Sequence, residues 1–315
     1  MKRLVFNVFF SCEGNAKAPN IHGAKIDAYD IYVRNSFVSL LSAKKKCESV
    51  EVAIVTNAPL RDDYRALFER NGIHNYLVPF DRFTVPDSFK WGYAFYKLCA
   101  LWHVVHRYEF DTYLELDTDT VTVGDLEPMW CDVETTKRVL LFNLHRSINH
   151  PVGTVINRDY HKIYTQPIHI DQLGGEYICG TRHALKKFVH QLESVYNEFK
   201  KDDFRLLDSS SGDEALVSMA AARLDHETLG YANPYINRFW TGSFYLVSTN
   251  WKNDPVLIWH LPAEKKYGML RLYKKFICLD KEDLTVDDIA KLCSMPKAVP
   301  GLSVAMVSKI ISHLR

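Results

Sequence analysis

The chain has 315 residues, of which 47% are apolar and 24% are charged, with 39 lysines and arginines against 38 aspartates and glutamates. This length and apolar fraction are enough for one large α/β domain with a full core. Aromatic residues make up 13% of the chain, which excludes low-complexity disorder. A net charge of +1 gives no basic excess for nucleic acid, so we expect a metabolic enzyme without a nucleic-acid partner.

The cysteine pattern and the apolar runs bear on the cellular compartment. The seven cysteines are scattered and contain no Cys-x-x-Cys pair, which indicates neither a disulfide framework nor a zinc ribbon. No run approaches 18 apolar residues, so we expect no transmembrane segment. The apolar stretch near the start is short and is interrupted by Asn7, which favours a buried first strand over a secretion signal. We therefore expect a reduced, cytoplasmic protein.

Strand-like and helix-like segments alternate through the first half of the chain. Strands are expected at residues 4–10, 50–55, 76–79 and 112–116, and helices at residues 29–46, 61–71 and 89–108. This alternation predicts an α/β fold with a mostly parallel, nucleotide-binding sheet flanked by helices. Residues 143–175 are polar and rich in histidine, and we expect a loop there, forming a substrate loop or plain surface.

The second half has a weaker pattern. Helices are expected at residues 185–200 and 213–224, a strand at 256–260, and two short helices within 283–315. We divide the chain into a main domain, residues 1–278, and a helical C-terminal extension, residues 279–315. Apolar residues recur at helical spacing in the extension. This favours packing on the domain or on a second copy of the chain, as in a homodimer, over peripheral contact with a membrane.

The most informative segment is Tyr113-Leu-Glu-Leu-Asp-Thr-Asp-Thr-Val-Thr-Val123, in which Asp117 and Asp119 follow a predicted central strand. On an extended backbone, residues i and i+2 project to the same face, so we expect both carboxylates to bind one cation. The carboxyl ends of parallel strands are also where ligands bind in open α/β sheets. About one Asp-x-Asp arises by chance in a chain of this length. The prediction of a cation site therefore depends on the position of the motif at the end of a strand.

Two enzyme classes use this pattern. In one, Asp-x-Asp holds a metal that bridges the diphosphate of a nucleotide-sugar; in the other, haloacid-dehalogenase-type phosphatases, the first aspartate is the nucleophile. Asp117-Thr-Asp-Thr-Val121 fits the phosphatase pattern locally. However, 116 residues precede the motif, and Gly212-Asp213 is followed four residues later by Val217 instead of a second aspartate. The phosphatase is therefore the alternative hypothesis, together with a non-catalytic UDP-sugar-binding relative.

The second half contains Val256-Leu-Ile-Trp-His260 and, six residues after this histidine, Lys266. The spacing resembles the His-x-x-Gly-x-x-Lys-Pro-Trp pattern of the retaining glycosyltransferases of family 8, the group of glycogenin and bacterial lipooligosaccharide galactosyltransferases. Ala263, Tyr267 and Gly268 replace the Gly, Pro and Trp of that pattern. Further resemblances lie at residues 96–102 (the family's Lys-Leu-x-x-Trp helix), 27–29 (its first nucleotide-contacting segment) and 120–129 (the run after the metal motif).

The chain departs from the family at three other places. Residues 11–26 form an insertion after the first strand. Leu173-Gly-Gly-Glu-Tyr-Ile-Cys-Gly180 replaces the family's Asn-Ser-Gly-like element at the sugar site, and the family's Asp-Gln pair is Asp213-Glu214.

The resemblance implies an A-type glycosyltransferase fold. It also implies that a hexose (glucose, galactose or N-acetylhexosamine) moves from a UDP-sugar to a saccharide or other hydroxyl acceptor, with retention. The implied cofactor is Mn²⁺, with Mg²⁺ second, held by Asp117, Asp119 and His260. The implied donor-binding residues are Tyr29, Lys97, Asp117, Thr118 and Lys266, with Asp213 and Glu214 as the catalytic pair. Because Asp213 and Glu214 open a predicted helix, an ordinary capping role is the alternative for them.

Overall fold

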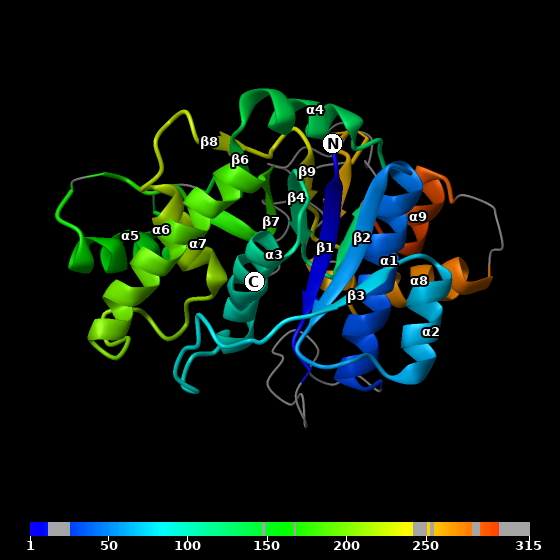
Figure 1. The fold of residues 1–315 in the computed structure, drawn as a ribbon, viewed down its shortest axis with the longest axis horizontal. Coiled ribbons are helices and arrows are strands. Elements are labelled where there is room, and N and C mark those ends of the chain that lie inside the picture. Colours follow the sequence, from blue (N-terminus) through cyan, green and yellow to red (C-terminus); the bar gives the residue numbers. More distant parts are fainter. Residues whose placement is uncertain are drawn as a thin grey trace, which may run out of the picture.

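The computed structural model describes residues 1–11, 26–146, 149–166, 168–241, 251–252, 255–278 and 284–295, and every structural statement below concerns these residues. Two β-sheets lie at the centre and helices flank them (Figure 1). The elements are, in chain order, β1 (Arg3–Phe9), α1 (Ala28–Lys46), β2 (Val50–Thr56), α2 (Asp62–Arg70), β3 (His74–Leu77), η2 (Gly92–Phe95), α3 (Tyr96–Arg107), β4 (Thr112–Leu116), β5 (Thr120–Thr122), α4 (Glu127–Thr136), β6 (Val139–Asn143), α5 (Pro151–Ile163), β7 (Leu173–Thr181), α6 (Arg182–Lys201), α7 (Asp213–Ala221), β8 (Leu229–Tyr231), β9 (Ile236–Arg238), β10 (Ile258–His260), η4 (Pro262–Glu264), α8 (Gly268–Cys278) and α9 (Val286–Leu292).

The large sheet has seven strands in the order β3-β2-β1-β4-β7-β6-β8. Its neighbouring strands pair in parallel, except that β7 is antiparallel to both β4 and β6. The small sheet has the order β5-β10-β9, with β10 antiparallel to β5 and parallel to β9. The mostly parallel α/β sheet expected from the sequence is therefore confirmed. Because β7 runs in the opposite direction, Leu116 at the end of β4 pairs with Tyr177 in the middle of β7, and the first half of β7 extends beyond β4.

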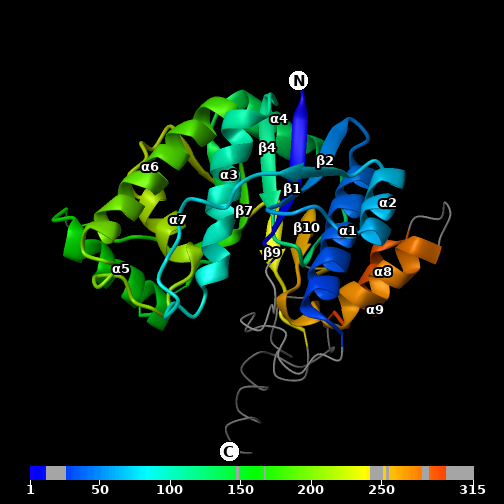
Figure 2. The ribbon, with the colours of Figure 1, turned by 60° about the horizontal axis from the view of Figure 1, so that its bottom comes forward.

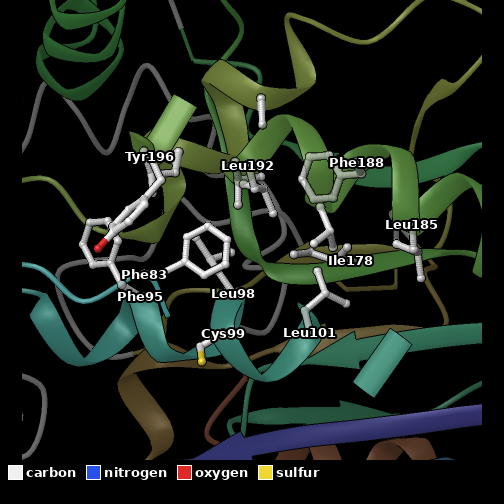
Figure 3. Close-up of a cluster of buried hydrophobic side chains, with 14 of the residues drawn as sticks. Phe83, Phe95, Leu98, Cys99, Leu101, Ile178, Leu185, Phe188, Leu192 and Tyr196 are labelled. Carbon is white, nitrogen blue, oxygen red and sulfur yellow. The ribbon is translucent and has the colours of Figure 1, made fainter. Parts of the chain in front are cut away.

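Two hydrophobic clusters lie on opposite faces of the large sheet. The helices α1, α2 and α4 cover one face, and α3, α5, α6 and α7 cover the other (Figures 1 and 2). In the second cluster, Leu101 of α3 and Phe188 of α6 pack on either side of Ile178 from β7 (Figure 3). All three side chains are at most 1% exposed. Full burial of such a side chain stabilises the fold by about 1.5–3 kcal/mol, so these contacts fix α3 on the sheet.

A third cluster joins the small sheet to α8 and α9. Trp259 of β10 packs against Phe239 and Trp251, with ring centroids 5.8 and 5.2 Å apart, and Ile289 of α9 belongs to the same cluster. Thus α9, from the predicted C-terminal extension, packs close to α8. The second helix expected in that extension lies outside the described residues, as does most of the insertion at 11–26. None of the described helices is long and apolar enough to cross a membrane.

One expectation is wrong. The stretch 143–175 contains helix α5 and the start of β7, where a loop was expected. The helix begins with Pro151, whose fixed backbone suits a first helical turn, and His150 accepts a hydrogen bond from the Val152 N–H at 3.3 Å. Ile156 and Tyr160 are buried at helical spacing, so apolar packing stabilises a segment whose composition is polar.

Candidate active site

The site begins where the carboxyl end of β4 meets the amino end of β7. Asp117 and Asp119 follow β4 in a tight turn that returns as β5. Thr120 closes this turn, because its N–H and its hydroxyl donate to the Asp117 carbonyl at 3.3 and 2.8 Å. The sequence predicted an extended backbone for the two aspartates, but in the structure they flank a turn. The turn nevertheless brings their carboxylates together.

A buried polar network supports the turn from behind. Asn7 of β1 donates to the Leu116 carbonyl at 2.7 Å, and the hydroxyls of Ser39 and Thr120 lie 2.7 Å apart. Side chains of β1 and α1 therefore hold the turn in place. The polar residue that interrupts the first apolar run is part of this support.

Asp117, Asp119 and His260 come together as predicted. One ligand atom of each lies within 4.8 Å of the other two. The His260 Nε2 atom is 3.3 Å from Asp119 Oδ2 and 3.6 Å from Asp117 Oδ2. Within the described structure, His260 Nε2 and Asp119 Oδ1 are buried without a hydrogen-bond partner. Buried carboxylate and imidazole atoms that face one point without partners fit a divalent cation of the Mn²⁺ or Mg²⁺ type.

A lysine holds each of these aspartates; Lys97 is half-buried and Lys265 is buried. The Lys97 Nζ atom of α3 lies 2.7 Å from Asp117 Oδ1, 2.7 Å from Asp213 Oδ2 and 3.0 Å from the Gly175 carbonyl oxygen. These three acceptors match the three N–H groups of an ammonium. The second cation is Lys265, whose Nζ atom lies 2.9 Å from Asp119 Oδ2. Lys97 therefore connects the metal motif to the start of α7, and Lys265 connects it to the segment after β10.

Asp213 approaches β7 very closely. It is the first residue of α7 and is 6% exposed. A Cβ atom at position 175 would lie 1.9 Å from Asp213 Oδ2, and one at position 174 would lie 2.0 Å from Glu176 Oε2. Both distances are far below any contact that a real Cβ makes. The glycine pair of Gly174 and Gly175 therefore makes room for two carboxylates that larger residues would displace.

Glu176 and Arg238 form a second charged group beside the first. The Arg238 guanidinium donates to both oxygens of Glu176, at 2.7 and 2.8 Å, and to Glu214 Oε1 at 2.8 Å. Gln172 donates to the other oxygen of Glu214 at 2.9 Å. Glu176 Oε1, which accepts from Arg238 Nε, also lies 3.1 Å from His260 Nδ1. Both members of the predicted catalytic pair, Asp213 and Glu214, are therefore held by cations of the site.

The pKa values in the site follow from burial opposed by neighbouring charges. Burial would raise the pKa of Asp119, but Lys265 and His260 hold it well below its usual range. Burial would lower the pKa of His260, yet its carboxylate neighbours raise it to about 9. Burial prevails at Asp213, whose pKa is raised, and at Glu115, whose pKa is raised well above its usual value. Asp119 is therefore ionised at neutral pH.

The remaining predicted residues lie in varied surroundings. Thr118 is 7% exposed within the turn. Tyr29 packs edge-on against Phe9, and the Arg61 guanidinium lies 4.2 Å from its ring centre. Lys266 is half-buried next to Tyr267. Stacking of Tyr29 on uracil and donor contact by Lys266 stay predictions.

Sequence reasoning missed Lys265, Glu176 and Arg238. Lys265 is adjacent to the predicted Lys266, and the family pattern marks only the position of Lys266. One sequence signal could have identified Glu176: it is a charged residue directly after two glycines in an otherwise apolar run. A charged residue buried in such a run needs a partner of opposite charge. Arg238 lies in an aromatic stretch without any recognisable motif.

Comparisons with known proteins give matches at the level of structure. No protein-family model matches the chain, and no curated protein sequence matches it. The galactosyltransferase LgtC, solved in complex with donor and acceptor sugar analogues, matches over 89% of this chain and 97% of its own, with a TM-score of 0.55 and 15% identity. Mouse xyloside xylosyltransferase 1, in its apo form, matches over 82% of this chain and 97% of its own, with a TM-score of 0.51 and 12% identity. At these identities the likeness concerns the fold, and the chain has the A-type glycosyltransferase fold that the sequence predicted.

Proposed function

We propose that the chain is a metal-dependent glycosyltransferase that moves a hexose from a UDP-sugar to a saccharide or other hydroxyl acceptor, with retention. The observation that carries the proposal is the convergence of Asp117, Asp119 and His260 at the carboxyl end of β4. Two structural neighbours with this fold are a galactosyltransferase and a xylosyltransferase. The fold also counts against the phosphatase hypothesis.

The proposed metal is Mn²⁺, with Mg²⁺ second, held by Asp117, Asp119 and His260. When bound, the ion would act as a Lewis acid that offsets charge on the leaving diphosphate. The chain itself supplies fixed cations around this point. Lys97 orients Asp117 and Asp213 through its contacts at 2.7 Å, and Lys265 orients Asp119. Fixed charges of this kind stabilise developing charge without reorganisation.

Glu214 bears on how the configuration would be retained. One of its oxygens accepts from Arg238 at 2.8 Å and the other accepts from Gln172 at 2.9 Å. A carboxylate with both oxygens engaged is a weaker nucleophile, which counts against a covalent glycosyl-enzyme formed on it. We therefore propose a route without a covalent intermediate, in which the departing phosphate oxygen takes the proton of the acceptor hydroxyl. The new C–O bond then forms on the face where the old bond breaks. Asp213 is proposed to bind hydroxyls of the donor sugar.

A polar cavity supports a place for the acceptor. It has a volume of about 220 Å³, and its lining includes His145, Arg146, Asp171 and Gln172. Since Gln172 also binds Glu214, the cavity adjoins the proposed reaction centre. Its hydrogen-bonding groups suit a saccharide. Its lining comes from the histidine-rich stretch, on both sides of α5.

The test is UDP release from UDP-glucose, UDP-galactose and UDP-N-acetylglucosamine, each with Mn²⁺, Mg²⁺ or EDTA. We expect metal-stimulated release that Asp119→Asn reduces at least about 100-fold, as expected when a group that stabilises transition-state charge is lost. The control Asp63→Asn, at an exposed position on α2, should keep full activity. Full activity in Asp119→Asn would refute the metal assignment.

UDP binding without turnover indicates the non-catalytic relative, and phosphate release from small phosphoesters indicates the phosphatase. The anomeric configuration of the product tests retention.

A further inference from the structure

Glu176 stands between a proposed metal ligand and a buried arginine. Its side chain is 1% exposed, and its Oε1 atom lies 3.1 Å from His260 Nδ1 and 2.7 Å from Arg238 Nε. Its Oε2 atom accepts from Arg238 Nη2 at 2.8 Å. Both oxygens are therefore engaged, and the carboxylate has a fixed orientation.

The geometry determines which nitrogen of His260 faces the aspartates. An ionised carboxylate only accepts hydrogen bonds, so the hydrogen between Glu176 and His260 belongs to Nδ1. The other nitrogen, Nε2, then points toward Asp117 and Asp119, at 3.6 and 3.3 Å from their Oδ2 atoms. A ring held in this way presents its Nε2 atom where a cation would bind.

The backbone around Glu176 is built for this contact. Gly174 leaves the space that the Glu176 carboxylate occupies, since a Cβ there would lie 2.0 Å from Oε2. The Glu176 carbonyl accepts from the Asp117 N–H at 3.0 Å, which ties the strand directly to the metal motif. Arg238 fixes the carboxylate through both of its oxygens and links it to Glu214. The contact therefore depends on three separate elements, β7, β9 and β10.

We propose that Glu176 is a positioning residue that holds the His260 imidazole, through Nδ1, in the orientation that binds the divalent cation. The proposal rests on the proposed function, because it assumes the metal site at Asp117, Asp119 and His260. The competing explanation is that Glu176 only neutralises Arg238. A carboxylate that orients a metal-bound histidine typically changes metal affinity 10–100-fold when it is removed, whereas a remote ion pair does not.

The experiment measures Mn²⁺ binding to the full chain by titration calorimetry, without and with saturating UDP. Glu176→Gln keeps the size of the side chain but loses its charge, and we expect Mn²⁺ affinity to fall about 10–100-fold. The matched control is Glu134→Gln. Glu134 is a partly buried carboxylate that accepts from Arg3 at 2.8 Å, at the opposite end of the sheet. Its replacement should leave the affinity unchanged.

A spectroscopic readout separates positioning from a general loss of stability. Pulsed electron paramagnetic resonance detects the imidazole nitrogen on bound Mn²⁺. We expect a clear nitrogen coupling in the wild type, a weakened or lost one in Glu176→Gln, and none in His260→Ala. If Glu176→Gln does not fold, Glu176→Asp keeps the charge but withdraws the carboxylate from His260 by one methylene. It should show the same loss of affinity and coupling.

The outcomes distinguish the two proposals. Wild-type Mn²⁺ binding that Asp119→Asn abolishes, together with unchanged affinity and nitrogen coupling in the folded Glu176 variant, overturns the positioning role and leaves the metal site intact. Absence of Mn²⁺ binding by the wild type, with and without UDP, overturns both.

Discussion

Replacing Gly175 by alanine tests how closely β7 approaches the start of α7. An added Cβ would lie 1.9 Å from Asp213 Oδ2 and 2.7 Å from the carboxyl carbon of the same side chain. Either β7 or the carboxylate must therefore move. Asp213 can move away only by giving up its 2.7 Å contact with the Lys97 ammonium. The substitution therefore relieves the steric conflict only by weakening the ion pair between Lys97 and Asp213.

The expected cost follows from these two routes. If β7 shifts, overpacking of a tight interior lowers the free energy of unfolding by about 1–3 kcal/mol. If instead the Lys97–Asp213 pair breaks, the loss of a buried partner costs about 3–5 kcal/mol, since the Asp213 side chain is 9% exposed. Either route also disturbs Lys97, which binds the carbonyl of Gly175 at 3.0 Å. We therefore expect reduced UDP release as well as reduced stability.

The assay is urea denaturation followed by circular dichroism, with UDP release measured on the same samples. The matched control is Gly153→Ala in α5, where the nearest atom to an added Cβ is Gln172 Oε1 at 3.9 Å. This control should be neutral or more stable by up to about 1 kcal/mol, because alanine favours a helix over glycine. A Gly175→Ala protein with the stability of this control and the activity of the wild type would refute the close approach.

Three further predictions concern the metal, the paired lysines and the core. Removing Mn²⁺ with EDTA should lower the unfolding temperature of the wild type but not of Asp119→Asn; at a concentration of 100 times Kd the lost stabilisation is about 2.7 kcal/mol. Lys265→Met should reduce stability by about 3–5 kcal/mol in chemical denaturation, because buried Asp119 loses its partner, whereas Lys266→Met should raise KM for the donor with little change in stability. Phe188→Ala should cost about 3–5 kcal/mol in the same measurement, and the exposed control Lys186→Ala less than about 0.5 kcal/mol. A small effect of Phe188→Ala would show that the cluster between α3 and α6 tolerates a cavity.

The first half of the fold was predictable because its segments are strongly periodic. The strand Thr112–Leu116 was predicted with its observed bounds, and the helix expected from residue 29 begins at Ala28. The β7 strand was not predicted, because three glycines and a glutamate oppose strand propensity. Tertiary contacts outweigh that propensity here, since eight of its nine residues are buried between β4 and β6.

The candidate site was predictable only where its residues follow a pattern along the chain. Asp117, Asp119 and His260 belong to recognisable runs, and the structure brings them together. Glu176 lies 62 residues from Arg238 and 84 from His260. No spacing rule connects such distant positions, because their contact depends on the reversed direction of β7 and on the second sheet.

The charges of the site explain how a nearly neutral chain suits a metal-bound anion. The carboxyl groups of the site are those of Asp117, Asp119, Glu176, Asp213 and Glu214, and the permanent cations are Lys97, Arg238 and Lys265. Five carboxyl groups therefore face three permanent cations and His260, whose pKa is raised to about 9. A divalent cation bound through Nε2 would replace the proton of that nitrogen and add one further positive charge. Lys97 binds Oδ1 of Asp117 and leaves Oδ2 facing His260, so a cation there adds to the lysine without displacing it. The overall charge of +1 therefore conceals a local deficit of positive charge at the point where the proposed metal would bind.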